Sequence, residues 1–165
     1  MSSARDVIRQ QLQNSQMLIE KFSSDLTDQE YFVPAVPGAN HAAWIVGHIA
    51  VSEDFIVGKI TGKGMRLPQA MHDVFNGKSV CHAGASKYPP RRQIDELHRT
   101  TRAHSLEDLS LFPDTRWSES APAGMNPAMF PTLGAMWGMI GAHPFWHIGQ
   151  LTTNRVALKK GRILT

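Results

Sequence analysis

Two histidines near the end of the chain are spaced so that they could bind one metal ion. The stretch HPFWH places His143 and His147 four residues apart. In a helix each residue turns about 100°, so the two imidazoles would lie about 40° apart on one face. The same face carries Leu133, Met136, Ile140 and Leu151. Apolar residues at this spacing indicate that the face, and with it both imidazoles, points into a core.

A third histidine, His48, occurs in WIVGHIAVSEDF. On a helix it shares a stripe with Trp44, Val51, Ser52 and Phe55, so it should also face the core. Burying an unpartnered polar group costs about 1 to 3 kcal/mol, and a divalent cation would give the three imidazoles a common partner. Three histidines plus a water make an open coordination site of the catalytic type. We therefore expect the set His48, His143 and His147 to bind a divalent metal ion, with zinc, nickel, iron and manganese all open as its identity.

The spacing leaves a second interpretation open, in which the histidines are hydrogen-bonded core residues. The chain has eight histidines, so an HxxxH pair can arise by chance. Glu53 and Asp54 are rotated from His48 by about 140° and 120°, and we expect them to face solvent or a neighbouring helix. For His98 and His104 we expect an exposed helix surface.

Pro144 lies between the two C-terminal histidines. Inside a helix a proline removes one backbone hydrogen bond and clashes with the preceding turn, at a cost of about 3 kcal/mol. The sequence therefore predicts either a kink in the last helix or the start of a new helix at Pro144.

The elements that must position these residues are helical. Apolar periodicity and the positions of glycine, proline and Thr132 predict four long helices and one short one. Their ranges are about 5–26, 41–60, 90–112 and 132–160, with the short helix at 69–75. None of the connections reads as a hairpin of alternating strands. The prediction is an all-α four-helix bundle with long connections, formed by residues 1–165 as a single domain.

Composition excludes several classes of protein. The chain has 165 residues, 42% of them hydrophobic, which suits one compact domain. The longest run without a polar residue, 133–142, is shorter than the roughly 20 residues of a membrane helix. A net charge of +3 with scattered basic residues argues against a nucleic-acid partner. The polar start, MSSARDVIRQQ, and the lone Cys81 predict a cytoplasmic protein.

Other residues are weaker candidates for chemistry. Cys81 and His82 are adjacent in a predicted loop, where neighbouring side chains rarely face each other, and GxSxG, P-loop and HExxH motifs do not occur. Gln150 and Arg155 lie within about 60° and 80° of His147 on the helix. Either could contact a substrate, Arg155 through an anionic group. We expect Tyr88 to contribute a substrate contact from the loop 61–88.

The motifs WIVGHIAVSEDF and HPFWHIGQLTTNR, with YPP before the third long helix, resemble the DinB-like superfamily of bacterial four-helix bundles. The resemblance covers nearly the whole chain in helix order. It implies an up-up-down-down bundle, a homodimer, and a divalent metal held by one histidine of the second helix and two of the last. Matched by motif, these are His48, His143 and His147.

The resemblance also limits the function. Some members resemble thiol S-transferases that use low-molecular-weight thiols, and others resemble hydrolases or isomerases. Fold likeness does not choose among them. The resulting expectation is a metal-dependent enzyme that activates water or a thiol for a small-molecule substrate. The alternative is a non-catalytic dimeric bundle in which the histidines, or a metal bound to them, are structural.

Overall fold

Five α-helices make up most of residues 3–161 and 163, the part of the chain that the computed structural model describes. They are α1 (Ala4–Ser23), α2 (Ala42–Thr61), α3 (Gln69–Phe75), α4 (Arg91–Leu111) and α5 (Leu133–Ala157). Single-turn 3-10 helices in the connections are η1 (Glu30–Phe32), η2 (Ala85–Lys87) and η3 (Asp114–Arg116). These described residues form no β-strand, only an isolated bridge between Ser120 and Thr132. The all-α prediction is confirmed.

Local signals fix the ends of the long helices. The side chain of Thr132 caps α5 by accepting from the Ala135 N–H, as its position before the helix predicts. His41 caps α2 in the same way, because its Nδ1 accepts from the Trp44 N–H at 3.0 Å. Gly62 ends α2 in the left-handed conformation, with φ of 76°. None of the described helices combines the length and apolar character that crossing a membrane requires.

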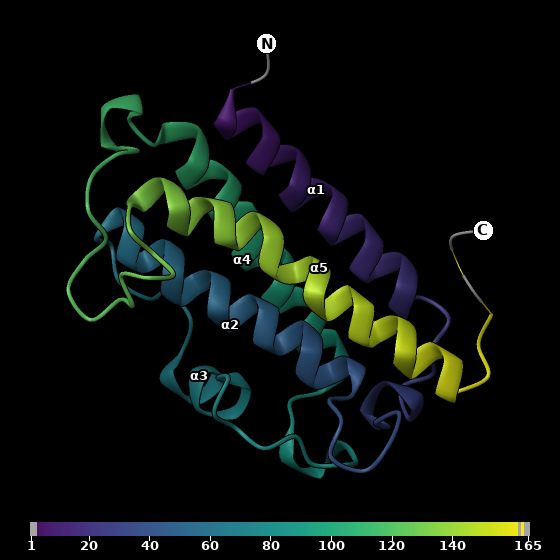
Figure 1. Ribbon diagram of the computed structural model, residues 1–165. Coiled ribbons are helices and arrows are strands. Elements are labelled where there is room, and N and C mark those ends of the chain that lie inside the picture. The colour runs from purple at the N-terminus through teal and green to yellow at the C-terminus, as the bar shows by residue number, and fades with distance from the viewer. Residues whose placement is uncertain (1–2, 162, 164–165) are drawn as a thin grey trace.

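Two of the long helices run in one direction and end at the same pole of the bundle. In the last turn of α5, Arg155 Nη1 donates to the Phe22 carbonyl in the last turn of α1 at 2.8 Å. Asn154 Nδ2 donates to the Asn40 carbonyl, just before α2, at 2.8 Å. Helix α2 therefore starts where α1 and α5 end, and runs antiparallel to both of them (Figure 1).

The opposite pole shows that α2 and α4 are parallel to each other. Lys63, just after α2, forms an ion pair with Asp108 near the end of α4 at 2.6 Å. Arg5, at the start of α1, donates to the carbonyl of Phe112, which follows α4, and to Asp114 at 2.6 Å. In chain order the long helices thus run up, down, down and up.

The predicted up-up-down-down order is therefore wrong. The connection 24–41 turns the chain back at one pole, which makes α1 and α2 antiparallel. Residues 62–90 then form a crossover along the outside of the bundle, and α3 is part of it (Figure 1). This crossover must return over the length of the 20-residue α2, about 30 Å.

The crossover packs closely on α2 through α3. Residues 42–51 of α2 are all buried. At Gly47 the ring of Phe75 lies directly against the α2 backbone, where a Cβ atom would overlap it. This contact places the end of α3 beside His48.

Helix α4 buries polar side chains as well as apolar ones. Arg102 is fully buried and pairs with Glu53 of α2 at 2.8 Å. It also donates to Ser15 Oγ at 3.0 Å and to the Leu12 carbonyl. One turn earlier, His98 is only 2% exposed, so the expectation of an exposed His98 is wrong. Glu53 faces the neighbouring helix α4, one of the two positions predicted for it; the other was solvent.

Candidate metal site

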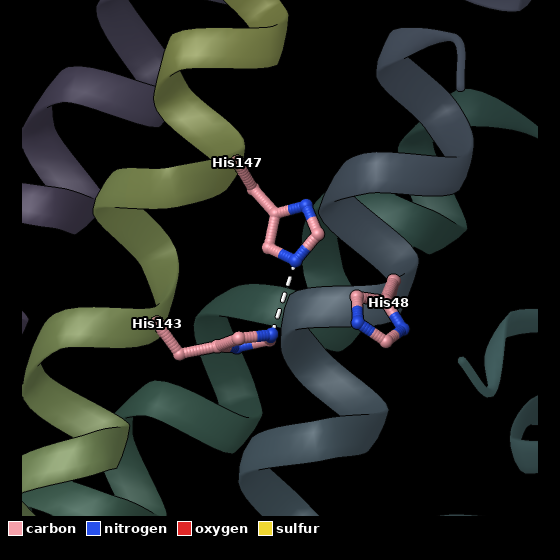
Figure 2. A group of neighbouring side chains, drawn as sticks. All are labelled: His48, His143 and His147. Atoms are coloured by element: carbon pink, nitrogen blue, oxygen red, sulfur yellow. Dashed lines mark hydrogen bonds between the residues drawn. The ribbon is translucent and has the colours of Figure 1, made fainter. Parts of the chain in front are cut away.

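The three histidines singled out by spacing converge between α2 and α5. His48 projects from α2 toward His143 and His147 of α5 (Figure 2). One ring nitrogen from each lies within 4.8 Å of those of the other two. His48 and His147 are each 8% exposed, and His143 is half-buried. We call these three residues the histidine triad.

Hydrogen bonds orient two of the rings and set their tautomers. His48 Nδ1 donates to the Phe75 carbonyl at 2.8 Å, since a carbonyl can only accept. His147 Nδ1 lies 3.2 Å from Gln150 Oε1 and donates to it. Both rings therefore present an Nε2 lone pair toward the centre of the triad. Ligating histidines in metal sites are oriented in this way by outer partners.

The remaining contact within the triad joins the two histidines of α5. His147 Nε2 lies 3.0 Å from His143 Nε2, and because His147 carries its proton on Nδ1, His143 Nε2–H is the donor (Figure 2). Two imidazole nitrogens bound at about 2.0–2.1 Å to one zinc ion would lie about 3.3 Å apart in tetrahedral geometry. A cation can therefore take the place of this proton with little movement of the rings.

Burial keeps the triad in the neutral form that metals bind. It lowers the pKa of His143 to about 3, with His147 and His48 contributing through charge repulsion. It lowers the pKa of His147 to about 4, helped by His48 and opposed by the hydrogen bond to Gln150. The pKa of His48 is also lowered by burial, although its bond to the Phe75 carbonyl opposes this. A neutral, nitrogen-only donor set fits a borderline ion such as zinc, nickel or iron.

The crossover covers one side of the triad. The Trp44 indole stacks on the His48 ring, with centroids 4.6 Å apart and planes at 10°. Trp44 Nε1 donates to Ser79 Oγ of the crossover at 3.0 Å. A Cβ atom on Gly77 would lie 3.5 Å from His48 Cε1, so the backbone there sits against the imidazole edge. His48 is thereby held from α2, α3 and the following turn together.

The other side of the triad is less completely covered, since His143 is half-buried. Ser52 Oγ, one turn after His48, lies 3.4 Å from His48 Nε2. Trp146 is 64% exposed and its ring meets the His143 ring edge-on, with centroids 6.3 Å apart. Ser52 and the exposed Trp146 therefore both lie next to the triad. The sequence predicted Ser52 on the same helical stripe as His48. It could not predict that the Ser52 hydroxyl lies near His48 Nε2, because this depends on the side-chain conformations.

The structure places the three predicted substrate contacts differently from one another. Gln150 lies at the triad, where it orients His147. Tyr88 does not contact the triad but packs on Phe75, with ring centroids 5.8 Å apart. Its hydroxyl accepts from the His82 N–H at 2.8 Å. Burial raises the pKa of the Tyr88 hydroxyl to about 12.

Arg155 is not brought to the triad. It is buried at the pole of the bundle, where its guanidinium donates to Asp25 Oδ2 at 3.0 Å and to the Phe22 and Gly161 carbonyls. The structure gives no support to the predicted contact between Arg155 and a substrate anion, because its guanidinium is already paired with Asp25 and two carbonyls. Rotation about the helix alone made Arg155 a candidate, but the eight residues that separate it from His147 also place it about 12 Å farther along the axis.

Pro144 does not start a new helix. Helix α5 runs unbroken from Leu133 to Ala157, with Pro144 buried inside it. His143 and His147 thus belong to the same helix, one turn apart, on either side of the proline.

Comparison with known proteins agrees with this architecture. A sequence profile described as the DinB superfamily matches residues 11–151, which include the whole triad. The crystal structure of a conserved protein of a locus from Enterococcus faecalis superimposes with a TM-score of 0.75 at 13% sequence identity, over 97% of this chain and 100% of that chain. At this identity the likeness shows the fold. No curated protein matches the sequence. Because the profile spans most of the chain, the protein belongs to the DinB superfamily.

Proposed function

We propose that the protein is a divalent-metal-dependent enzyme in which His48, His143 and His147 hold the metal. The observation that carries the proposal is the convergence of the three imidazoles, two of them with their Nε2 lone pairs fixed inward by the Phe75 carbonyl and by Gln150. Three protein ligands leave a coordination position open for a reactant. Zinc, nickel, iron and manganese are the candidate ions.

When bound, a divalent ion lowers the pKa of a coordinated water or thiol and so supplies a nucleophile near neutral pH. The chain's own residues provide the surroundings for that chemistry. Trp44 and the crossover shield His48 from water on one side. Ser52, at 3.4 Å from His48 Nε2, offers a hydroxyl that can donate to or accept from a reactant bound at the triad.

The reaction class that this site supports best is hydrolysis or thiol S-transfer on a small molecule. The partial exposure of His143 and the exposed Trp146 beside it favour a catalytic role over a purely structural one, because a structural site is closed by its protein ligands. Among the described residues no carboxylate is hydrogen-bonded to the triad, so the proton of the nucleophile would pass to solvent or to the substrate itself, directly or relayed by the Ser52 hydroxyl.

The proposal is tested by metal analysis of protein purified without a histidine tag. We expect about one equivalent of divalent metal per chain, before or after reconstitution, as for a single three-ligand site. The His147→Ala variant should lose this metal and keep its helical circular dichroism. His104→Ala, at a half-buried position on α4, is the matched control and should keep the metal. A wild-type protein that takes up none would disprove the proposal.

Cobalt substitution separates a catalytic site from a structural one. In an open site the visible spectrum of the bound cobalt should change when a small thiol or azide is added, because the ligand enters the free position. A cobalt spectrum that does not respond to either would assign the metal a structural role.

A further inference from the structure

One stripe of α2 continues from the triad toward the opposite pole of the bundle. Ser52, Phe55 and Lys59 all lie within about 60° of one another and of His48 around the helix. Exposure rises along this stripe, from 8% at His48 to 39% at Phe55, and Lys59 is exposed. A molecule bound at the triad can therefore extend along this increasingly exposed stripe of α2 without entering the core.

A cavity lies at the far end of this stripe. Its volume is about 560 Å³, within the range of about 300–1,000 Å³ for small-molecule sites. The lining includes Phe55, Lys59, Ile60, Met65, Arg116 and Pro122. These residues come from the end of α2, from the turn after it, and from the connection between α4 and α5, which lies at this pole (Figure 1). The wall is mostly apolar, with two cationic side chains.

Within the described chain, the cavity wall carries one unpaired cation, Lys59, and one paired cation, Arg116. Lys59 Nζ lies 5.6 Å from the centre of the Phe55 ring, and over residues 3–161 Lys59 has no ion-pair partner. Arg116 pairs with Glu119 at 2.9 Å, but this pair is exposed and contributes little to stability. No carboxylate is among the described residues that line the cavity. An unpaired cation beside an exposed phenyl ring suits a ligand with both an anionic and an apolar part.

We infer that the substrate is an elongated organic anion, a carboxylate or phosphate, whose apolar segment lies over Phe55 and whose anionic end binds Lys59 and Arg116. The inference rests on the proposed function for the reacting end, which would lie at the triad. Lys59 leans toward Phe55, and Phe55 is seven residues from His48, about 10 Å along the helix. The anion therefore lies between the levels of Phe55 and Lys59, about 10 to 17 Å along the helix from His48.

Binding at the cavity is tested without metal, by calorimetry with octanoate and its neutral counterpart octanamide. Octanoate should bind more tightly than octanamide. Lys59→Gln should weaken octanoate binding about tenfold, as expected for loss of a hydrogen bond to a charged group. Lys21→Gln, at an exposed lysine in the last turn of α1, is the control and should leave it unchanged. Equal binding of acid and amide, or an equal loss in both lysine variants, would overturn the inference.

A second measurement connects the cavity to the triad. The monohydroxamate of octanedioic acid carries a metal-binding group at one end and a carboxylate at the other. On metal-loaded protein Lys59→Gln should weaken this ligand about tenfold and leave acetohydroxamate unaffected. If Lys59→Gln leaves the long ligand unaffected, the two sites do not share one substrate and the inference fails.

The two proposals fail in different ways. His147→Ala should abolish metal uptake and still bind octanoate, since the cavity does not include the triad. Protein that takes up no metal but binds octanoate through Lys59 would refute the metal site and keep the cavity as an anion site. Protein that takes up metal but does not prefer octanoate would refute only the cavity.

Discussion

At the scale of single residues, the triad is shaped as much by its outer partners as by the histidines. The Phe75 carbonyl fixes the tautomer of His48, and Gln150 fixes that of His147. The i, i+4 spacing of the ligands and the position of Gln150 one turn later could be read from the sequence, because helical rotation is a local property. The Phe75 carbonyl could not, because it comes from a connection whose path has no local signal.

Gln150 should act as a positioning residue for the metal. Gln150→Ala removes the acceptor of the His147 Nδ1–H, and loss of such a partner costs about 10- to 100-fold in metal affinity. Gln150→Glu keeps an acceptor at this place and should restore most of the affinity. Competition with a chelator of known affinity measures the change. Equal affinity in Gln150→Ala and wild type would show that the contact does not orient the ring.

At the scale of elements, the caps and lengths of the long helices follow from local sequence, while their directions do not. Thr132 begins α5 as expected. The direction of α2 relative to α1 depends on whether the connection 24–41 reverses the chain or crosses along the bundle. Both this connection and 62–90 are long enough to do either, so the sequence did not decide between them. The buried face of α4 was also misjudged, because it carries polar residues such as His98 and Arg102 that normally mark a solvent face. Their partners come from distant parts of the chain.

The docking of α3 on α2 should be sensitive to one atom at Gly47. In Gly47→Ala the added methyl group overlaps the Phe75 ring, and overpacking of this kind costs about 1 to 3 kcal/mol. Metal affinity should fall as well, because Phe75 supplies the carbonyl bonded to His48. Unfolding in urea and chelator competition measure the two effects.

Gly138→Ala is the matched control for this change. Gly138 also lies within a long helix, but no atom stands within 4 Å of the position a Cβ would take. Alanine there should stabilise the protein by up to about 1 kcal/mol through helix propensity. If Gly47→Ala is as stable as Gly138→Ala, then Phe75 does not pack on α2 as described.

At the scale of the whole molecule, the bundle holds a buried titratable group apart from the metal site. His98 Nε2 has no hydrogen-bond partner among the described residues. Burial, aided by the charge of Arg102, lowers the pKa of His98 to about 4 from its usual 6.5. The folded protein therefore keeps His98 neutral under conditions in which the unfolded chain protonates it.

The free energy of unfolding should consequently fall in mild acid. As the pH drops from 6.5 to about 4, His98 becomes protonated in the unfolded state but not in the folded state. This lowers the free energy of unfolding by up to about 3 kcal/mol. Above about pH 7 this loss is absent. The His98→Leu variant, with an apolar side chain of similar volume, should lose less stability than wild type between about pH 7.5 and pH 5, measured by urea unfolding of metal-free protein. Parallel losses in both proteins would contradict this account.

The crossover and the metal site share His48, and this has a thermodynamic consequence. The same imidazole that offers its Nε2 to a cation offers its Nδ1–H to the last residue of α3, and the stacked Trp44 is bonded to Ser79. Thermodynamic linkage is reciprocal. If the ordered conformation of residues 75–79 increases the affinity for the metal, then metal binding stabilises that conformation by the same free energy. Residues 75–79 would then be less protected from amide exchange and proteolysis when the metal is removed. Protection of this segment would therefore show whether metal is bound.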